Sequence, residues 1–141
     1  MARGSSIKAV LHAPGVNWKK VSSLRRDSKV EPPHSVYHHH AVKDPFYILD
    51  LGVVVELSKR WTQRLEKVQH LCAVKCNPGP ACLGPMAALG SGFNCASHGE
   101  IEAVLALGIS PDRITYAYPY KAKSHIKYGA NVGVILTTID S

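Results

Sequence analysis

One short stretch is the most informative part of the sequence for the fold: residues 71–77, which read Leu71-Cys72-Ala73-Val74-Lys75-Cys76-Asn77. Its apolar and small residues predict a buried strand, in which alternation would place Leu71, Ala73 and Lys75 on one face. A charged lysine is costly to bury, and this one stands at the carboxyl end of the strand, where α/β folds place their active sites. Lysines in that setting serve as amine nucleophiles that form Schiff bases. The alternative is a side chain that reaches solvent from the strand end.

The flanking sequence alternates strand signals and helix signals. β-propensity predicts strands at residues 46–51, 71–76, 92–96, 114–117 and 134–138, which begin about 20 to 25 residues apart. Apolar residues at steps of three and four predict a helix between the first two strands, with the stripe Val54, Leu57, Trp61, Leu65 and Val68. A second apolar stripe, formed by Ile101, Val104 and Leu105, predicts another helix, which ends at Gly108.

Repeated β–α units at this spacing predict a parallel sheet with crossover helices. Periodicity leaves two forms open, a closed barrel and an open, doubly wound sheet. A complete (β/α)8 barrel takes about 250 residues. We therefore expect residues 44–141 to form a truncated (β/α)8 TIM-type barrel with about the first four to five strands. The last predicted strand runs into Ser141 with no helix after it, and such an open edge is typical of a cut chain.

Residues 1–43 have a different composition and predict a basic N-terminal extension. They hold eight Lys/Arg against Asp27 and Glu31, whereas residues 44–141 hold nine against eight acids, so most of the net charge of +7 lies in the extension. We expect this segment to be solvated and partly disordered. Two other interpretations are an arm for nucleic acid and an organelle transit segment, because no acidic residue precedes Asp27.

Composition excludes several classes of protein. Hydrophobic residues make up 45% and charged residues 19%, as in ordinary globular proteins. We expect neither a membrane span nor a secretory signal, and we predict a cytoplasmic protein that binds no nucleic acid. The cysteines form no CxxC pair and predict reduced thiols: Cys72, Cys76, Cys82 and Cys95. A zinc site that joins some of them to His70 or His98, or a metal at His38-His39-His40, is disfavoured, so we predict no metal.

Several strings keep one order and spacing along residues 44–141. They are 45–52 (PFYILDLG), 73–77 (AVKCN), 92–97 (GFNCAS) followed by 100–102 (EIE), and 107–114 (LGISPDRI). Together they resemble the opening strand, the cofactor-lysine motif and the next strands of eukaryotic ornithine decarboxylases, which belong to the pyridoxal-phosphate-dependent Orn/DAP/Arg decarboxylase family. The pair Cys76-Asn77 fits the ornithine branch best.

The resemblance implies a (β/α)8 barrel with a β-domain, assembled as a homodimer. Lys75 would bind pyridoxal 5′-phosphate (PLP), and the reaction would convert ornithine to putrescine in polyamine biosynthesis. The cofactor supplies the electron sink, and the protein supplies positioning and electrostatics. Glu100 matches an active-site glutamate of the family. The residues Ser97 to Glu100 also form a capping box, and the two roles of Glu100 are compatible.

Departures from the family leave alternatives open. Asn94 stands where the family has an acidic residue beside the cofactor lysine, and an amide keeps the shape but loses the charge. Catalysis would then be impaired, or the substitution is tolerated. Gly84-Pro85 falls inside a predicted helix, where proline costs about 3 kcal/mol.

The resemblance also implies that the family's phosphate-binding loop, ring-stacking histidine and pyridine-nitrogen carboxylate lie beyond Ser141. We therefore expect the chain alone to be inactive. A non-catalytic regulatory relative and an unrelated Schiff-base aldolase or barrel enzyme are the other hypotheses.

Overall fold

Four short parallel strands form the centre of the molecule. The computed structural model of the chain describes residues 3–17 and 47–139. The sheet has the order β1-β2-β3-β4, with β1 (Leu71–Ala73), β2 (Gly92–Cys95), β3 (Ile114–Tyr116) and β4 (Leu136–Thr137). Parallel strands in simple sequence order need successive crossovers of one hand, as in a barrel, whereas a doubly wound sheet reverses its order. The predicted fold class, the first strands of a (β/α)8 barrel, is confirmed.

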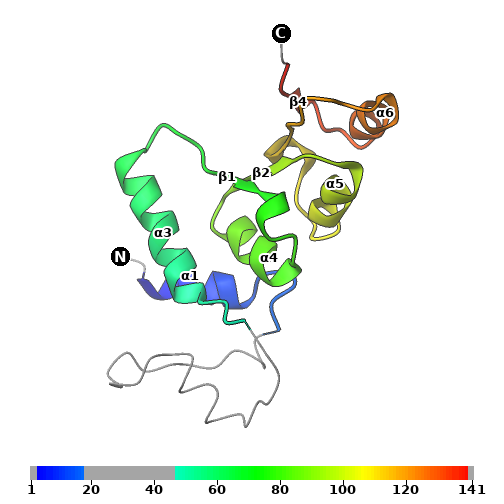
Figure 1. Ribbon diagram of the computed structural model, residues 1–141. Coiled ribbons are helices and arrows are strands. Elements are labelled where there is room, and N and C mark those ends of the chain that lie inside the picture. The colour runs from blue at the N-terminus through cyan, green and yellow to red at the C-terminus, as the bar shows by residue number, and fades with distance from the viewer. Residues whose placement is uncertain (1–2, 18–46, 140–141) are drawn as a thin grey trace.

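In the described part of the chain, two helices precede β1, and one helix follows each of β1, β2 and β3 in chain order (Figure 1). Their bounds are α1 (Arg3–Leu11), α3 (Leu51–Arg64), α4 (Pro80–Ala88), α5 (His98–Leu105) and α6 (Lys123–Asn131), with two 3-10 turns, η2 (Val74–Cys76) and η3 (Pro111–Arg113). Local sequence explains the ends of several. The Asp50 carboxylate accepts a hydrogen bond from the backbone N–H of Val53 at 3.0 Å and so begins α3. Gly108 has φ +75°, which turns the chain after α5 as predicted.

The sheet has one buried face and one open face. The buried face carries Phe93 and Cys95 of β2 beside Ile114 and Tyr116 of β3, and these residues pack with the helices. The rest of this core consists of Val74, Leu83, Ile101, Val104, Ile109 and Val134. Register places one residue from each strand in a row on the opposite face: Ala73, Asn94, Thr115 and Leu136. In a barrel this second face is the interior.

Three predicted strands differ from the structure by more than one residue. The strand expected at residues 46–51 is wrong in its described part, because residues 47–50 have no regular structure and Leu51 already begins α3. Tyr47 is fully exposed, and β-propensity forms a strand only where a neighbouring strand completes its hydrogen bonds. The strand expected over residues 71–76 ends at Ala73, where η2 begins. The last strand is shorter than predicted and covers only Leu136 and Thr137.

Helix α3 forms as predicted, but its apolar stripe is not buried. Leu57 and Trp61 are exposed, and the buried residue of α3 is Val55. Leu65 caps the end of the helix, and Val68 lies beyond it. The apolar period therefore predicted the helix correctly, while most of its apolar stripe is exposed in the described residues.

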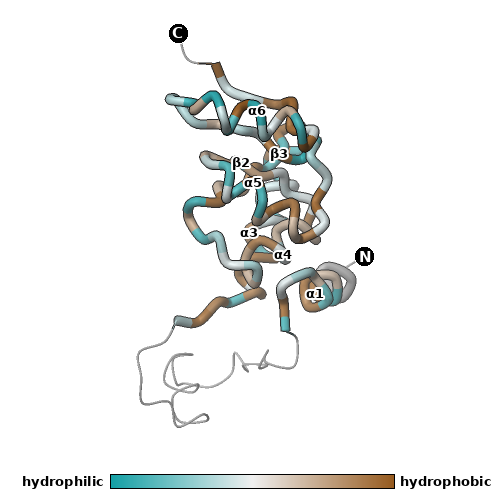
Figure 2. Tube along the Cα trace, turned by 90° about the vertical axis from the view of Figure 1, so that its right-hand side faces the viewer, coloured by the Kyte–Doolittle hydropathy of each residue, from teal (hydrophilic) through white to brown (hydrophobic). Residues whose placement is uncertain are grey.

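The N-terminal residues 3–17 pack against the body of the protein. Helix α1 lies against α3 and α4, and Val10 is only 1% exposed. Figures 1 and 2 both show α1 beside α4, at the end of the molecule away from α6. The chain after α1 passes so close to Gly84 that the carbonyl of Pro14 occupies the place of a side chain. The rest of the basic extension, residues 18–43, and the three histidines within it lie outside the described residues.

No helix in the described ranges is long and apolar enough to cross a membrane. Helix α4 carries Pro85 in its interior, as predicted, and buries it.

Candidate active site

The carboxyl ends of the parallel strands meet at one edge of the sheet. Lys75 lies at this edge, two residues after β1, in η2. Lys75 lies at the carboxyl end of β1 as predicted, but it lies beyond the strand and not on it, so the expected alternation with Leu71 and Ala73 does not extend to it. Val74 is fully buried, whereas Lys75 is exposed. The 3-10 turn thus buries the valine in the helix-side core and leaves the lysine amine accessible.

Asn94 lies on the neighbouring strand and on the open face of the sheet. It pairs in register with Ala73 of β1 and Thr115 of β3 and is half-buried. Lys75 follows Ala73 by two residues, so the structure brings the amide and the lysine to the same end of adjacent strands. Within the described residues, the two side chains share no hydrogen bond. Asn94 therefore offers a neutral donor and acceptor near Lys75 and no charge.

Glu100 performs the predicted capping role at the start of α5. Its Oε2 accepts a hydrogen bond from the backbone N–H of Ala96 at 2.7 Å, and its own N–H donates to Ser97 Oγ at 3.3 Å. The capping pattern usually returns to the N-cap residue itself, but here it reaches one residue further back. Glu100 thereby ties the end of β2 to the first turn of α5.

The Glu100 carboxylate also acts on Cys95. Burial, and then the charge of Glu100, raise the pKa of the Cys95 thiol to about 12. Cys95 is fully buried on the helix side of β2. This thiol remains protonated and unreactive, as expected for a structural cysteine.

Two residues at the carboxyl edge of the sheet were not predicted from the sequence as site residues. Lys121 Nζ donates to the carbonyl oxygens of Tyr118 and Thr138, both at 2.6 Å, so it ties the segments after β3 and β4 together. Tyr116 is buried at the end of β3, and its hydroxyl has no hydrogen-bond partner among the described residues. Burial raises its pKa, with a smaller contribution from Tyr118. No periodic pattern marks either residue.

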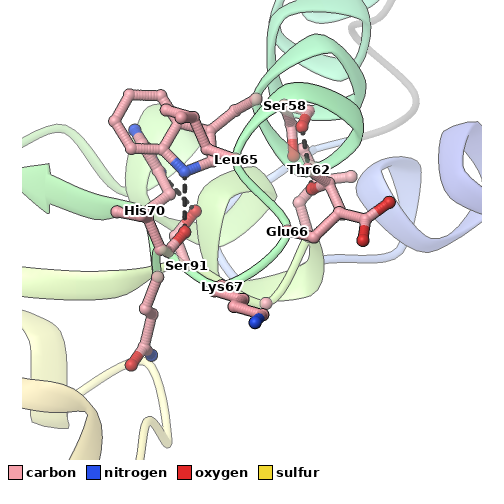
Figure 3. A pocket seen from close by; sticks show the side chains of 12 residues that line it. Ser58, Thr62, Leu65, Glu66, Lys67, His70 and Ser91 are labelled. Carbon is pink, nitrogen blue, oxygen red and sulfur yellow. Dashed lines mark hydrogen bonds between the residues drawn. The ribbon is translucent and has the colours of Figure 1, made fainter.

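A pocket of about 320 Å³ lies at the opposite end of the strands (Figure 3). It is lined by residues that precede β1 and β2, and His70 Nδ1 lies 2.9 Å from Ser91 Oγ within it. The indole N–H of Trp61 donates to the carbonyl of Val68 at 2.9 Å. Because its polar groups bind one another and it opens at the amino ends of the strands, this pocket is separate from Lys75.

The zinc alternative has no geometric support in the described part of the chain, where no group of three His, Cys, Asp or Glu side chains could hold a metal. His98 lies instead against the Tyr128 ring, with centroids 3.6 Å apart, and its Nε2 is 3.3 Å from Glu102.

Comparisons with known proteins agree with the resemblance that the sequence motifs of residues 44–141 indicated. Residues 51–141 match the family model described as pyridoxal-dependent decarboxylase, pyridoxal binding domain. A chloroplastic ornithine decarboxylase of Nicotiana glutinosa is 57% identical over 99 residues, which are 70% of this chain and 23% of the relative. Ornithine decarboxylase of Schizosaccharomyces pombe is 46% identical over 101 residues, covering 72% and 23%. The chain thus spans about a quarter of the length of these relatives.

Solved structures share the fold. Ornithine decarboxylase from Entamoeba histolytica superposes with a TM-score of 0.71 at 32% identity, covering 77% of this chain and 35% of that one. SrLDC in complex with PLP and cadaverine superposes with a TM-score of 0.72 at 28% identity, covering 86% and 31%.

Proposed function

Because the chain belongs to the family of pyridoxal-dependent ornithine and related decarboxylases, we propose that it is the cofactor-binding part of an ornithine decarboxylase. The sequence resemblance is confirmed at the level of the family, a family of carboxy-lyases. One observation carries the proposal: Lys75 presents an accessible amine at the carboxyl end of β1, inside the matched domain.

The residues at this edge fit PLP in one respect that can be tested, its covalent attachment. An aldehyde needs an exposed amine, and Lys75 supplies one at the end of the strand that pairs with Asn94 on the open face. When bound, PLP supplies an electron sink for the electron pair that remains as the carboxylate leaves as CO₂. The chain's own residues would attach the cofactor, orient it and transfer protons.

Each remaining site residue has a proposed role. Asn94 holds the shape of the site but places no negative charge near Lys75, so proton transfer by the lysine amine is weakened relative to a carboxylate. Glu100 acts through its bond to the Ala96 N–H, which holds the turn after β2 beside the lysine. Both proposed roles depend on the position of Asn94 and Glu100 at the edge of the sheet where Lys75 lies.

Substrate, assembly and compartment belong to the whole protein. We propose ornithine as substrate and putrescine as product in polyamine biosynthesis, on the names of the curated relatives and the pair Cys76-Asn77. Lysine and arginine are the alternative substrates, since a lysine decarboxylase and an arginine decarboxylase share the fold. A homodimer and a cytoplasmic location follow from the family expectation. The chloroplastic names of two relatives support a plastid as the alternative compartment.

Reductive trapping tests the attachment of PLP. The 141-residue chain is incubated with PLP, treated with borohydride and mapped by peptide mass spectrometry. We expect one dominant adduct on Lys75, which Lys75→Ala removes and the matched surface variant Lys123→Ala leaves intact. Adducts of equal occupancy on Lys75 and Lys123 would refute the proposal. No release of CO₂ from ornithine is expected from the chain alone.

A non-catalytic relative is the second candidate, and Asn94 favours it. The same experiment separates the two candidates, because a folded chain that takes up no PLP supports the non-catalytic relative. Introducing the acid by Asn94→Asp in the whole protein should raise the decarboxylation rate if the enzyme hypothesis holds.

A further inference from the structure

The segment that follows α1 lies directly on helix α4. A Cβ built on Gly15 would lie 2.5 Å from the Cβ of Pro80 and 2.7 Å from its carbonyl carbon and oxygen. One helical turn further along α4, the carbonyl group of Pro14 lies where a side chain on Gly84 would be. Residues 13–15, the clasp, therefore contact one face of α4 at both its first and its second turn.

The clasp has a fixed conformation of its own. Val10 at the end of α1 is 1% exposed and Ala13 is 6% exposed, so both side chains anchor the segment on the body of the protein. The N–H of Ala13 donates to the carbonyl of Val10 at 3.2 Å, and the N–H of Val16 donates to the carbonyl of Ala13 at 3.1 Å. Gly15 has φ +80°, a conformation that glycine adopts without a steric cost.

The start of α4 has no side-chain cap. Gly79 is the N-cap residue and offers no side-chain acceptor to the first turn. The N–H groups of Cys82 and Leu83 both donate to the carbonyl of Gly79, at 2.9 and 3.1 Å. An uncapped first turn frays readily, so this one depends on two contacts: Leu83, which is fully buried in the core, and Pro80, which contacts the clasp.

The first turn of α4 is joined to the turn that carries Lys75. The N–H of Gly79 donates to the side-chain oxygen of Asn77 at 3.0 Å, and the N–H of Asn77 donates to the carbonyl of Val74 at 3.1 Å. Only residues 77–79 lie between η2 and α4. Because these hydrogen bonds run without a break from α4 to η2, fraying of the first turn of α4 would reach the turn of Lys75.

We propose that the clasp is a strap that positions Lys75. Its contact with Pro80 and Gly84 orders the first turn of α4 and, through residues 77–79, the turn on which the lysine amine lies. The clasp lies outside residues 51–141, the part of the chain that the family model matches. Order in the turn does not depend on the cofactor, whereas control of the lysine rests on the proposed attachment of PLP.

Native-state hydrogen exchange on the whole, unmodified chain measures this dependence. The clasp is followed at the amides of Ala13 and Val16, and the turn at the amides of Asn77, Cys82 and Leu83. If release of the clasp loosens the turn, the turn amides open no less easily than the clasp amides, and both open in less urea than β2 and β3. Turn amides that stay protected in urea where the clasp amides exchange freely would overturn the proposal.

The variant Gly15→Ala separates the clasp from α4, and Gly108→Ala is the matched control. Both glycines have positive φ, +80° and +75°, so alanine strains the backbone in both. A Cβ on Gly108 meets nothing within 4 Å, whereas a Cβ on Gly15 overlaps Pro80. We expect the turn amides to exchange about tenfold faster in Gly15→Ala than in Gly108→Ala, as one overpacked contact predicts. Equal exchange in the two variants would overturn the proposal.

Reductive trapping with PLP tests control of the lysine. The preference of the adduct for Lys75 over Lys123 should fall several-fold in Gly15→Ala and persist in Gly108→Ala, because a lysine on a loosened turn reacts as an ordinary surface amine. An unchanged preference in Gly15→Ala would overturn control of Lys75. No preference for Lys75 in the unmodified chain would instead count against the proposed function, while the exchange result would stand.

Discussion

Replacing Gly84 by alanine tests whether residues 3–17 are an integral part of this protein. Gly84 lies in the interior of α4, and a Cβ built on it would overlap the carbonyl oxygen of Pro14 and lie 2.9 Å from its carbonyl carbon. Real Cβ atoms essentially never approach closer than 3.0 Å. The added methyl group must therefore push the segment after α1 away from α4.

The expected loss of stability follows from two opposing effects. Alanine is better than glycine in a helix interior by about 1 kcal/mol. Overpacking a close contact costs about 1–3 kcal/mol. Detachment of α1 limits this cost, because it exposes Val10, whose burial contributes about 1.5 kcal/mol, together with smaller groups such as Ala13. We expect Gly84→Ala to lower the free energy of unfolding by up to about 2 kcal/mol, the overpacking cost less the helix gain.

Urea unfolding followed by circular dichroism measures the change, and Gly129→Ala is the matched control. Gly129 lies in α6, where a Cβ would meet only Val134, at 3.9–4.0 Å, so alanine should stabilise by about 0.5–1 kcal/mol. Pro85 disfavours a Cβ on the residue before it, and this effect does not depend on α1. The effect of Gly84→Ala is therefore also measured in a chain without residues 1–17, which separates the two contributions. The packing of α1 would be refuted if deleting these residues left the effect of Gly84→Ala unchanged.

Three further perturbations test the caps, the buried thiol and the lysine clamp. Asp50→Ala and Ser97→Ala should each lower the free energy of unfolding by about 1 kcal/mol, with Ser97→Thr retaining most of it; no loss in urea unfolding would contradict the capping bonds. Because burial and Glu100 raise the pKa of Cys95 to about 12 from 9.0, the unfolded state loses its thiol proton first, and stability should fall between pH 9 and 12 by up to about 1.4 kcal/mol per unit. Cys95→Ala should remove that component of the slope, and identical slopes in the two chains would disprove it. Lys121→Met removes the donor to two carbonyls and should speed amide hydrogen exchange after β3 and β4, whereas unchanged exchange would show that the clamp carries no stability.

Much of the candidate site was predictable because its signals are local. The place of Lys75 after a strand follows from the apolar run before it. The spacing of three residues also predicts the bond from the Glu100 N–H to Ser97 Oγ, whereas the Glu100 side chain accepts from Ala96 and not from the predicted Ser97. The place of Lys75 on one strand face with Leu71 and Ala73 was mispredicted because strand alternation continues only while the chain remains extended. The 3-10 turn at Val74 rotates the next side chain to solvent. No local pattern reports that rotation.

The sequence by itself determined the alternation of strands and helices, the parallel sheet and the family, because periodicity, caps and motif spacing act over a few residues. The tertiary structure alone decided three things: that α1 packs on Gly84, that residues 47–50 form no strand, and that Asn94 shares an open row with Ala73 and Thr115. All three depend on contacts between segments far apart in the chain. Local sequence does not determine which distant segment will contact a given residue, so these contacts are seen only in the folded chain.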